Sequence, residues 1–238
     1  CAHDNQTRMA ISSKRSFYHM FLKMPLTNRK SSIVYWLPNE NHKRYSLYLN
    51  ITNRCCNNCY FCFRKFKDGI REFTLRLRRD PSFREIVGEL QKVLRRKDWS
   101  EIVFCGFGEP LERMDCVLEV TRWIKKYSEK AVRVDTNGQG YLLNSGEEVA
   151  MKLKSAGVDK LSVSLNGHDK ATYNQVCKPE FEYAFERVLE FIEEAKKADL
   201  ETEITAVTIP EVDIPKVREL SERIGVGFRV RAYIPCFW

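Results

Sequence analysis

The chain has 238 residues, of which 43% are hydrophobic, and it contains only 11 glycines and 8 prolines. This length and composition suit one large domain, and they exclude collagen-like and wholly disordered proteins. The longest apolar runs, such as 33–36 and 102–105, are far shorter than the roughly 20 residues that cross a bilayer. An odd total of nine cysteines does not suit a secreted disulfide framework, so we expect a reducing, cytoplasmic setting and no membrane partner.

The formal net charge of +8 is concentrated near the amino terminus. Residues 1–39 contain six Lys or Arg and one Asp, which leaves 34 cations against 31 anions for residues 40–238. A second excess, twelve Lys and Arg over six Asp and Glu, lies in residues 63–98. We interpret this stretch as a solvated helix face, with contact to nucleic acid as the alternative.

Residues 1–31 are rich in Ser, Thr, Asn and Lys and show no apolar period. The sequence therefore predicts a disordered or artefactual tail there. Because this stretch is basic and poor in acids, its composition also suits an organellar transit peptide. We expect residues 32–238 to form a single domain.

From residue 45 onward, short β-branched runs alternate with amphipathic stretches of helical period. Such alternation is typical of a parallel sheet covered by helices. Six strands are predicted, at 46–52, 101–107, 131–136, 160–166, 201–209 and 227–234. Six strands are too few to close an eight-stranded barrel. The predicted fold is therefore α/β, a partial (βα)6 TIM-like barrel whose open parallel sheet has outer helices and a site at the carboxyl ends of its strands.

Five helices are predicted between the strands, at about 80–97, after Pro110, at 145–157, at 181–195 and at 213–225. Asp80 before Pro81 is the expected start of the first helix, as an N-cap followed by a first-turn proline. Ser145 and Glu148 have the spacing of a capping box for the third helix. Glycines at the expected ends of the third and fifth helices are typical helix stops.

The most informative stretch is the loop after the first strand, NITNRCCNNCYFCFRKF. Here Cys55, Cys59 and Cys62 have the spacing CxxxCxxC, and no fourth Cys or His lies near them in sequence. Three soft thiolate ligands on a short loop suit a [4Fe-4S] cluster with one open iron better than a closed zinc site, which needs four ligands. Cys56 leaves an alternative, because Cys56, Cys59 and Cys62 have a ferredoxin-like CxxCxxC spacing.

This loop resembles the signature of the radical S-adenosylmethionine (SAM) superfamily, CxxxCx(aromatic)C after the first strand, with Phe61 as the aromatic residue. The resemblance favours Cys55 over Cys56 as a ligand, and it makes a [4Fe-4S] cluster and SAM the expected cofactors. It implies that the open iron binds the methionyl amine and carboxylate of SAM. It also implies that Phe61 lies against the adenine.

The second strand ends in FCGFGEP, where two glycines permit positive φ angles and a close approach of a ligand to the main chain. The carboxylate of Glu109 can accept hydrogen bonds from an ammonium group. The superfamily has a GGEP motif here that binds the methionyl amine, and Gly108, Glu109 and Pro110 match it. Phe107 departs from the motif, so the match at Gly106 is weaker than the match at Glu109.

Polar residues also end the next two strands. Asp135 and Asn137 in DTNG could hold ribose hydroxyls or a cation, or could simply form a turn. Ser164 and Asn166 end the fourth strand and point the same way by strand alternation. The superfamily resemblance implies that the DTNG strand end lies beside SAM and that Ser164 and Asn166 contact its ribose and carboxylate.

The sixth strand, FRVRAYIP, places Arg229, Arg231 and Tyr233 on one face. An arginine there either clamps a carboxylate or phosphate of the substrate or forms an ion pair at the rim of the core. The other cysteines have no paired spacing and are predicted to be small buried residues; they are Cys105, Cys116, Cys177 and Cys236. Cys236, close to the chain end, has the alternative of a mobile thiol that enters the site.

Across residues 46–235, a run of motifs resembles the TatD-associated radical SAM proteins. The motifs are LYLNITNRC, NCYFCFR, FCGFGEP, TNG, SVSLN, TYN and GVGFRVRAYIP. The branch is named for its link to TatD-type metal-dependent hydrolases, so such a hydrolase is a candidate partner. The branch provides no settled substrate.

The resemblance implies an oxidoreductase that cleaves SAM reductively to methionine and a 5'-deoxyadenosyl radical, which abstracts hydrogen from an unidentified substrate. A reductant such as flavodoxin or ferredoxin is the expected partner. One alternative is a glycyl-radical activating enzyme that acts on a protein partner, which DTNG favours. The other is a non-catalytic iron–sulfur module for electron transfer.

Overall fold

The computed structural model describes residues 30–31, 33–39, 44–96, 98–145 and 148–233. Its main sheet has seven strands in the order β10-β9-β8-β7-β6-β3-β2. They are β2 (Val34–Pro38), β3 (Tyr45–Leu49), β6 (Trp99–Phe104), β7 (Ala131–Thr136), β8 (Lys160–Ser164), β9 (Glu201–Val207) and β10 (Gly227–Arg231). Strands β3 and β6 to β10 run parallel, and β2 pairs antiparallel with β3.

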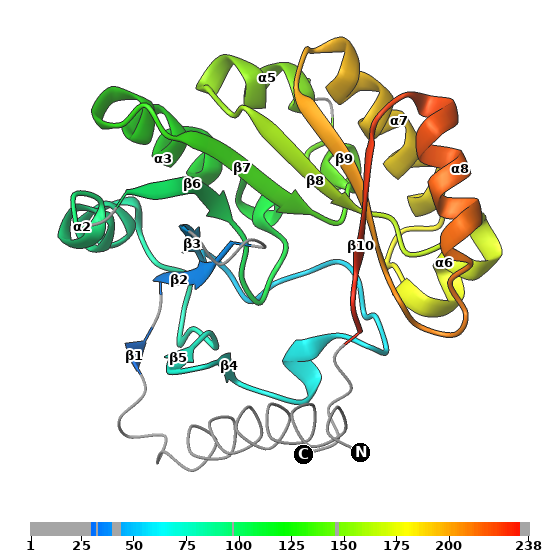
Figure 1. Cartoon of the computed structure of the whole chain (residues 1–238), viewed down its shortest axis with the longest axis horizontal. Coiled ribbons are helices and arrows are strands. Elements are labelled where there is room, and N and C mark those ends of the chain that lie inside the picture. Colours follow the sequence, from blue (N-terminus) through cyan, green and yellow to red (C-terminus); the bar gives the residue numbers. More distant parts are fainter. Residues whose placement is uncertain (1–29, 32, 40–43, 97, 146–147, 234–238) are drawn as a thin grey trace, which may run out of the picture.

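The sheet curves into an open arc with β2 and β10 at its two edges (Figure 1). This arrangement confirms the predicted partial barrel and its six parallel strands. Strand β2 is an addition to the prediction, because the apolar run before Pro38 is too short to show a period. The arc leaves the carboxyl ends of the parallel strands at one edge of the sheet, where the cysteine loop also lies.

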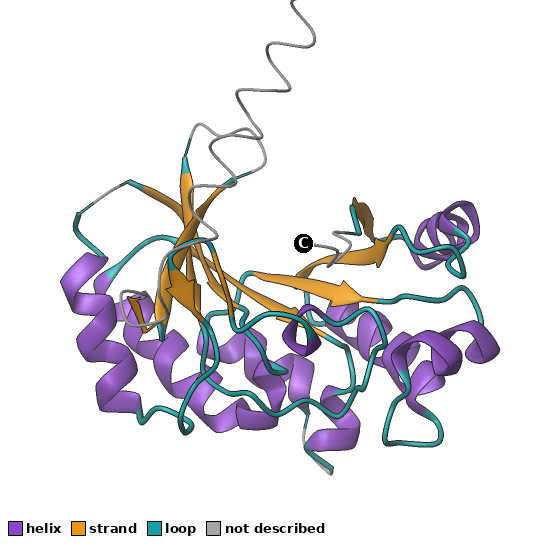
Figure 2. Ribbon diagram, turned by 90° about the horizontal axis from the view of Figure 1, so that it is seen from below, coloured by secondary structure: helices purple, strands orange, loops and turns teal. Residues whose placement is uncertain are grey.

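The helices cover one side of the sheet, whereas its other side faces the inside of the arc (Figure 2). They are α2 (Phe83–Val93), α3 (Met114–Tyr127), α4 (Gly140–Leu143), α5 (Val149–Ala156), α6 (Lys170–Cys177), α7 (Ala184–Lys197) and α8 (Ile214–Ile224). Two short 3₁₀ helices, η2 (Phe63–Lys65) and η3 (Pro110–Arg113), follow the cysteine loop and the GFGEP turn.

The first predicted helix start is wrong by two residues. The N-cap of α2 is Ser82 and not Asp80. The hydroxyl of Ser82 accepts a hydrogen bond from the Glu85 amide at 3.3 Å, and the Glu85 carboxylate accepts one from the Ser82 amide at 2.8 Å. This reciprocal capping box satisfies two amides that Asp80 would leave without partners.

The predicted capping box of the third helix is also wrong. Helix α5 begins after Glu148, which is its N-cap and makes no side-chain cap hydrogen bond, so Ser145 has no capping role there. The predicted stop is confirmed, because Gly157 ends α5 with a φ of 99°. The limits of the fifth helix are confirmed too, with Asp213 capping the start of α8 and Gly225 ending it.

The fourth predicted helix is α7, and it is preceded by a helix, α6, that the sequence analysis does not predict. Asp169 caps α6 by accepting a hydrogen bond from the Thr172 amide at 2.8 Å. Lys178 ends α6 in the left-handed conformation, with a φ of 46°. Helix α6 has only eight residues and a weak apolar stripe, which explains why periodicity did not reveal it.

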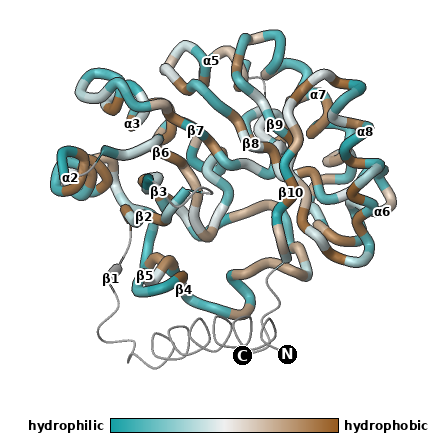
Figure 3. Tube along the Cα trace, in the orientation of Figure 1, coloured by the Kyte–Doolittle hydropathy of each residue, from teal (hydrophilic) through white to brown (hydrophobic). Residues whose placement is uncertain are grey.

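The two faces of the sheet differ in polarity. The outer face packs against the helices in one large apolar core, to which β6, β7 and β8 contribute Ile102, Phe104, Val132, Val134, Leu161 and Val163. Hydrophobic and hydrophilic residues alternate along α2 and α7, as expected for helices with one buried side (Figure 3). Because strand residues alternate between faces, burial of the apolar set leaves the polar residues on the inside of the arc.

A second sheet has three short strands, two of which follow the cysteine loop. Its order is β1 (Lys30–Ser31), β5 (Phe73–Thr74) and β4 (Gly69–Ile70). Strand β1 falls at the end of the predicted tail; the rest of that tail, like Cys236, lies outside the described residues. Within the part of the chain that is described, no helix is long and apolar enough to cross a membrane.

Candidate active site at the carboxyl ends of the strands

The cysteine loop joins β3 to η2 at the carboxyl edge of the sheet. Its three predicted ligands, Cys55, Cys59 and Cys62, are half-buried and form no disulfide. No His, Asp or Glu lies between residues 55 and 62. The loop therefore presents sulfur as its metal-binding side-chain donor.

Main-chain hydrogen bonds hold this loop against the carboxyl end of α6. The amide of Asn58 donates to the carbonyl of Cys177 at 3.0 Å, and the amide of Glu180 donates to the carbonyl of Cys56 at 2.9 Å. An antiparallel bridge between Asn57 and Pro179 lies between these two bonds. The helix that the sequence analysis missed is thus a structural support of the cysteine loop.

Cys56 is turned into the protein interior, and its side chain is only 1% exposed. Its sulfur accepts a hydrogen bond from the Asn137 side-chain amide at 3.1 Å, and its thiol donates to the Gln139 amide oxygen at 3.5 Å. Burial raises the pKa of Cys56, which keeps it a neutral thiol. This environment favours the half-buried Cys55 over Cys56 as the first ligand of the loop.

A buried polar network lies directly beneath the loop. The side-chain amide of Gln139, which is 0% exposed, donates to the Asn57 side-chain oxygen at 2.6 Å and to the Tyr173 hydroxyl at 3.1 Å. The sequence analysis did not single out any of these three residues. Asn57 lies between the cysteines and Gln139 directly follows DTNG, so proximity to those motifs is the signal that could have found them.

Cys59 lies beside Cys177, and the two thiols are hydrogen-bonded. This bond and burial raise the pKa of Cys59. The prediction that Cys177 is a small buried residue is confirmed, since it is 1% exposed. Its position beside a predicted ligand was not foreseen, because the two cysteines are far apart in sequence.

The described residues contain no group of three or more His, Cys, Asp or Glu side chains that is already arranged to hold a metal ion. The donor chemistry of the loop nevertheless fits an iron–sulfur cluster, because three thiols lie within eight residues on a loop without competing hard ligands. Burial raises the pKa of Cys55 to about 12, so metal binding would have to displace its proton.

The glycines of GFGEP allow close approach within the chain itself. A side chain at Gly106 would overlap Asn50, and one at Gly108 would overlap the carbonyl of Arg54. Neither glycine uses the positive φ angle that its missing side chain permits, because the described glycines with positive φ are Gly138, Gly157 and Gly225. Phe107, which departs from the family motif, packs in a small apolar cluster beside the cysteine loop.

Glu109 ties three segments of the site together. Its carboxylate, only 3% exposed, accepts hydrogen bonds from the Thr136 hydroxyl at 2.7 Å, the Asn137 amide at 2.6 Å and the Leu111 amide at 3.0 Å. Its own amide donates to the carbonyl of Arg54 in the cysteine loop at 2.7 Å. Burial raises the pKa of Glu109 from 4.5 to about 7, so an approaching cation would favour its ionised form.

Two other predicted residues flank this group. Pro110 is at the start of η3, next to Glu109, where a missing amide has no cost. Phe61 is half-buried and contacts Tyr60 edge to face, with ring centroids 5.5 Å apart. The hydroxyl of Tyr60 in turn donates to the Glu211 carboxylate at 2.5 Å.

The two predicted site residues of DTNG have different places. Asn137 belongs to the group around Glu109, and its side-chain amide donates to the sulfur atoms of Cys55 at 3.8 Å and Cys56 at 3.1 Å. Asp135 lies on the inner face of the sheet, where it forms an ion pair with Arg133 at 2.8 Å. Asp135 is therefore not part of the group formed by Glu109, Asn137 and the cysteine loop.

Ser164 and Asn166 also differ in their partners. Asn166 is 3% exposed, and its side-chain oxygen accepts a hydrogen bond from the Val207 amide at 3.0 Å, which ties β8 to the end of β9. The hydroxyl of Ser164 accepts a hydrogen bond from Arg231 at 3.1 Å. This bond places Ser164 and Arg231 on the same inner face of the sheet.

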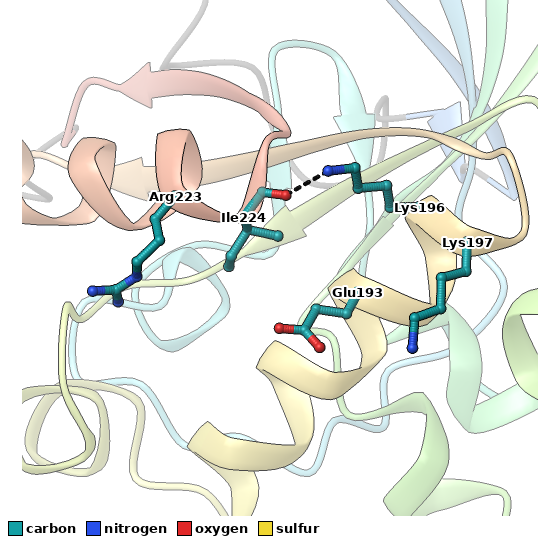
Figure 4. A pocket seen from close by; sticks show the side chains of 5 residues that line it. All are labelled: Glu193, Lys196, Lys197, Arg223 and Ile224. Carbon is teal, nitrogen blue, oxygen red and sulfur yellow. Dashed lines mark hydrogen bonds between the residues drawn. The ribbon is translucent and has the colours of Figure 1, made fainter.

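A surface pocket of about 400 Å³ lies between the ends of two helices (Figure 4). It is lined by Glu193, Lys196, Lys197, Arg223 and Ile224, at the carboxyl ends of α7 and α8. These helix ends precede β9 and β10, so the pocket is at the amino edge of the sheet. It contains none of the predicted site residues.

The comparisons with known proteins identify the superfamily of the chain. The family model of the radical SAM superfamily matches residues 49–224, which include the cysteine loop, the GFGEP turn and the ends of β7 and β8. The chain belongs to the radical SAM superfamily. Enzymes of this superfamily use a [4Fe-4S] cluster and SAM, the two cofactors predicted from the sequence.

Curated relatives share about a third of the aligned residues. A protein of Methanocaldococcus jannaschii named "Probable GTP 3',8-cyclase" is 31% identical over 80% of this chain and 59% of its own length. A protein of Saccharolobus islandicus with the same name is 28% identical over 76% of this chain and 54% of its own. The chain thus spans little more than half the length of these relatives.

Solved structures share the fold at low sequence identity. Methylornithine synthase (PylB) superposes with a TM-score of 0.59 at 18% identity, over 80% of this chain and 53% of that one. The structure of anSMEcpe with bound AdoMet gives 0.59 at 19% identity, over 79% and 50%. Both support the partial barrel.

Proposed function

We propose that this chain binds a [4Fe-4S] cluster and SAM at the carboxyl edge of its sheet and cleaves SAM reductively. When bound, the cluster and SAM supply one-electron cleavage to methionine and a 5'-deoxyadenosyl radical, which takes a hydrogen atom from a substrate inside the arc. The Glu109 group is the main support for this proposal. It joins the cysteine loop, the GFGEP turn and the end of β7 around one buried carboxylate.

The residues of the chain have separate tasks in this proposal. Cys55, Cys59 and Cys62 hold the cluster, and Cys56 stays a neutral thiol that anchors the loop to β7 through Asn137 and Gln139. Phe61, Ser164 and Asn166 are assigned to SAM from the motif resemblance. The clamp of α6 on the loop restricts how far the ligands can move, which is the usual role of supporting hydrogen bonds around a metal site.

Glu109 is assigned to the methionyl ammonium group of SAM. The carboxylate is only 3% exposed and burial raises its pKa, so the ionised form of Glu109 would be stabilised by a cationic partner. An ammonium group would provide that partner and would form charge-assisted hydrogen bonds. Thr136 and Asn137 fix the orientation of the carboxylate for this contact.

The test is anaerobic reconstitution of the cluster, reduction with dithionite and chromatographic assay of 5'-deoxyadenosine after addition of SAM. We expect 5'-deoxyadenosine from the wild type and none from Cys59→Ala, with Cys116→Ala as a matched control on the outer helix α3. Cysteine-independent formation would contradict the proposal. A fully loaded cluster that never cleaves SAM would contradict it as well.

GTP is the first substrate to test, because the curated relatives named above are called probable GTP 3',8-cyclases. A GTP-dependent increase in 5'-deoxyadenosine, together with a new nucleotide product, would support this choice. Absence of both with an active enzyme would rule GTP out. The glycyl-radical activating alternative predicts stimulation by a protein partner instead.

The finer assignment to the TatD-associated branch rests on the run of motifs in residues 46–235. From this assignment we propose a functional link with a TatD-type hydrolase. The proposed reductant is flavodoxin or ferredoxin. Co-purification of the hydrolase with the cluster-loaded chain tests the first link. Replacement of dithionite by reduced flavodoxin in the 5'-deoxyadenosine assay tests the second.

A further inference from the structure

Two arginines of β10, Arg229 and Arg231, are two residues apart, so both side chains lie on the inner face of the sheet. Both reach over β9 to a serine of β8: Arg229 donates to the Ser162 hydroxyl at 3.1 Å, and Arg231 donates to the Ser164 hydroxyl at 3.1 Å. The two side chains therefore have the same direction and matching hydroxyl partners. Their charged partners are different.

Arg229 is compensated by a carboxylate. Its guanidinium donates to the Glu203 carboxylate at 2.6 Å and 3.0 Å, and Glu203 also accepts a hydrogen bond from Ser162. This ion pair lowers the pKa of Glu203 against the effect of its burial. Of the two roles predicted for an arginine of this strand, Arg229 therefore has the second, an ion pair at the rim of the core.

The other carboxylates of the inner face also form ion pairs. Arg133 forms ion pairs with Glu101 at 3.0 Å and with Asp135 at 2.8 Å. Together with the pair of Arg229 and Glu203, these contacts occupy the acidic groups that face the inside of the arc along β6, β7 and β9. No ion pair joins any of them to Arg231 within the described chain.

Arg231 is left with one hydroxyl as its side-chain partner among the described residues. Its Nε atom is buried and has no hydrogen-bond partner. Burial lowers the pKa of Arg231, while the more distant Asp135 offsets this effect only in part. A buried cation without an ion-pair partner is costly, and a guanidinium has five donors to satisfy.

The position of Arg231 connects this missing partner to the proposed function. It is the last residue of β10, at the carboxyl edge of the sheet, where active sites of this kind of fold lie. Its planar fork matches the two oxygens of a carboxylate or phosphate better than a single point charge would. Its hydroxyl partner, Ser164, is on the strand end already assigned to the site.

We infer that Arg231 binds an anionic oxygen group of the substrate, a carboxylate or a phosphate, and that Arg229 is a positioning residue held by Glu203. The inference rests on the proposed function and adds a substrate class to it: the molecule that meets the radical is an anion. The anionic group of that molecule is bound at the carboxyl end of β10.

The experiment measures anion binding to the cluster-loaded protein with SAM present, by calorimetric titration with inorganic pyrophosphate and, separately, with succinate. We expect saturable binding of one of the two anions, which identifies the source as phosphate or carboxylate. Arg231→Gln should weaken that binding by about tenfold or more, the effect of losing hydrogen bonds between charged groups. Arg218→Gln removes the same charge from the outer side of β10, where Arg218 lies over the Phe228 ring, and should bind as the wild type does.

Arg231→Lys is the second variant in case Arg231→Gln does not fold. It keeps the charge and removes the fork, so we expect binding between that of the wild type and that of Arg231→Gln. Equal weakening in Arg218→Gln would reveal an unspecific charge effect and would overturn the inference. So would the absence of saturable binding of either anion by the wild type.

Two further outcomes separate this inference from the proposed function. If the wild type forms 5'-deoxyadenosine but Arg231→Gln binds both anions unchanged, the inference fails and the function stands. If the anion binds through Arg231 but SAM is never cleaved, the function fails instead. Loss of SAM binding in Arg231→Gln would place the carboxylate of SAM on this arginine and would overturn the assignment to a substrate.

Discussion

The two edges of the sheet use polar residues in opposite ways. At the carboxyl edge, Glu109, Asn137 and Gln139 are at most 8% exposed. Hydrogen bonds connect Glu109 to Asn137, Asn137 to Gln139, and Gln139 to Cys56 of the cysteine loop. At the amino edge, the pocket between α7 and α8 is lined by lysines and an arginine at the surface. Surface charges need no special role, whereas buried polar groups lower stability unless they are paired. The carboxyl edge is therefore where the fold depends on specific partners for its buried polar groups.

Among variants that test this difference between the two edges, replacement of a cysteine ligand should have the largest effect. Cys55→Ala, Cys59→Ala and Cys62→Ala should each lose the cluster, because three ligands leave no reserve on the loop. Cys56→Ala should keep it, since Cys56 is bonded to Asn137 and Gln139 in the interior. Iron and sulfide content after reconstitution measures the effect. Equal loss in all four variants would contradict the distinction between Cys55 and Cys56.

Glu109→Gln should weaken SAM binding by about tenfold or more, because the amide keeps the shape of the side chain but loses the charge that would hold an ammonium group. Equilibrium dialysis of cluster-loaded protein with labelled SAM measures the affinity. Glu112→Gln, in the same 3₁₀ helix, is the control. Unchanged affinity in Glu109→Gln would remove Glu109 from the SAM site.

The raised pKa of Glu109 predicts a dependence of stability on pH. The unfolded chain releases this proton near the usual value of 4.5, whereas the folded chain keeps it to about pH 7. The folded state therefore binds more protons between these values, and the stability contributed by this group falls as pH rises across the window. A shift of this size corresponds to about 3 kcal/mol.

Urea unfolding of the wild type and Glu109→Gln at several pH values isolates this contribution. The wild type should lose stability relative to the variant between about pH 5 and pH 7, and the difference should then level off. A difference that stays constant over the window would show that Glu109 ionises normally in the folded chain.

Gln139→Leu should lower the free energy of unfolding by about 1–3 kcal/mol, since it removes the hydrogen bonds that Gln139 donates to the buried Asn57 and Tyr173. Gln91→Leu on the exposed side of α2 is the matched control and should change it by less than about 0.5 kcal/mol. Denaturant melts measure both. Similar values for the two variants would mean that the network beneath the loop has no energetic importance.

The smallest effect is expected at the amino edge. Arg223→Gln changes a charge at the surface pocket and should leave SAM cleavage and cluster content unchanged. Its effect on stability should stay within about 0.5 kcal/mol. A marked loss of SAM cleavage would show that the amino edge takes part in function after all.

Local patterns predicted the main parts of the fold and of the site. Alternation of strands and helices gave the parallel sheet, and Asp213, Gly157 and Gly225 marked helix ends correctly. Spacing on one loop also identified Cys55, Cys59 and Cys62 as a group. These features depend on residues close together in sequence, which is the range in which periodicity and capping patterns act.

Contacts between distant segments were not predictable in this way. Cys177 lies beside Cys59 because α6 packs against the cysteine loop, and Gln139 lies beneath Asn57 because the segment after β7 packs there as well. The competition between Asp80 and Ser82 as N-cap was decided by the carboxylate of Glu85. The choice between Arg229 and Arg231 as a free cation depended on Glu203, which lies on another strand.

The most direct test of the account is the electron paramagnetic resonance spectrum of the dithionite-reduced cluster with and without SAM, in the wild type and in Glu109→Gln. The account predicts that SAM changes the spectrum of the wild type, because SAM binds at the cluster, and that Glu109→Gln responds only at much higher SAM concentrations. A cluster spectrum that SAM leaves unchanged in the wild type would contradict the claim that cluster and cofactor share this edge of the sheet.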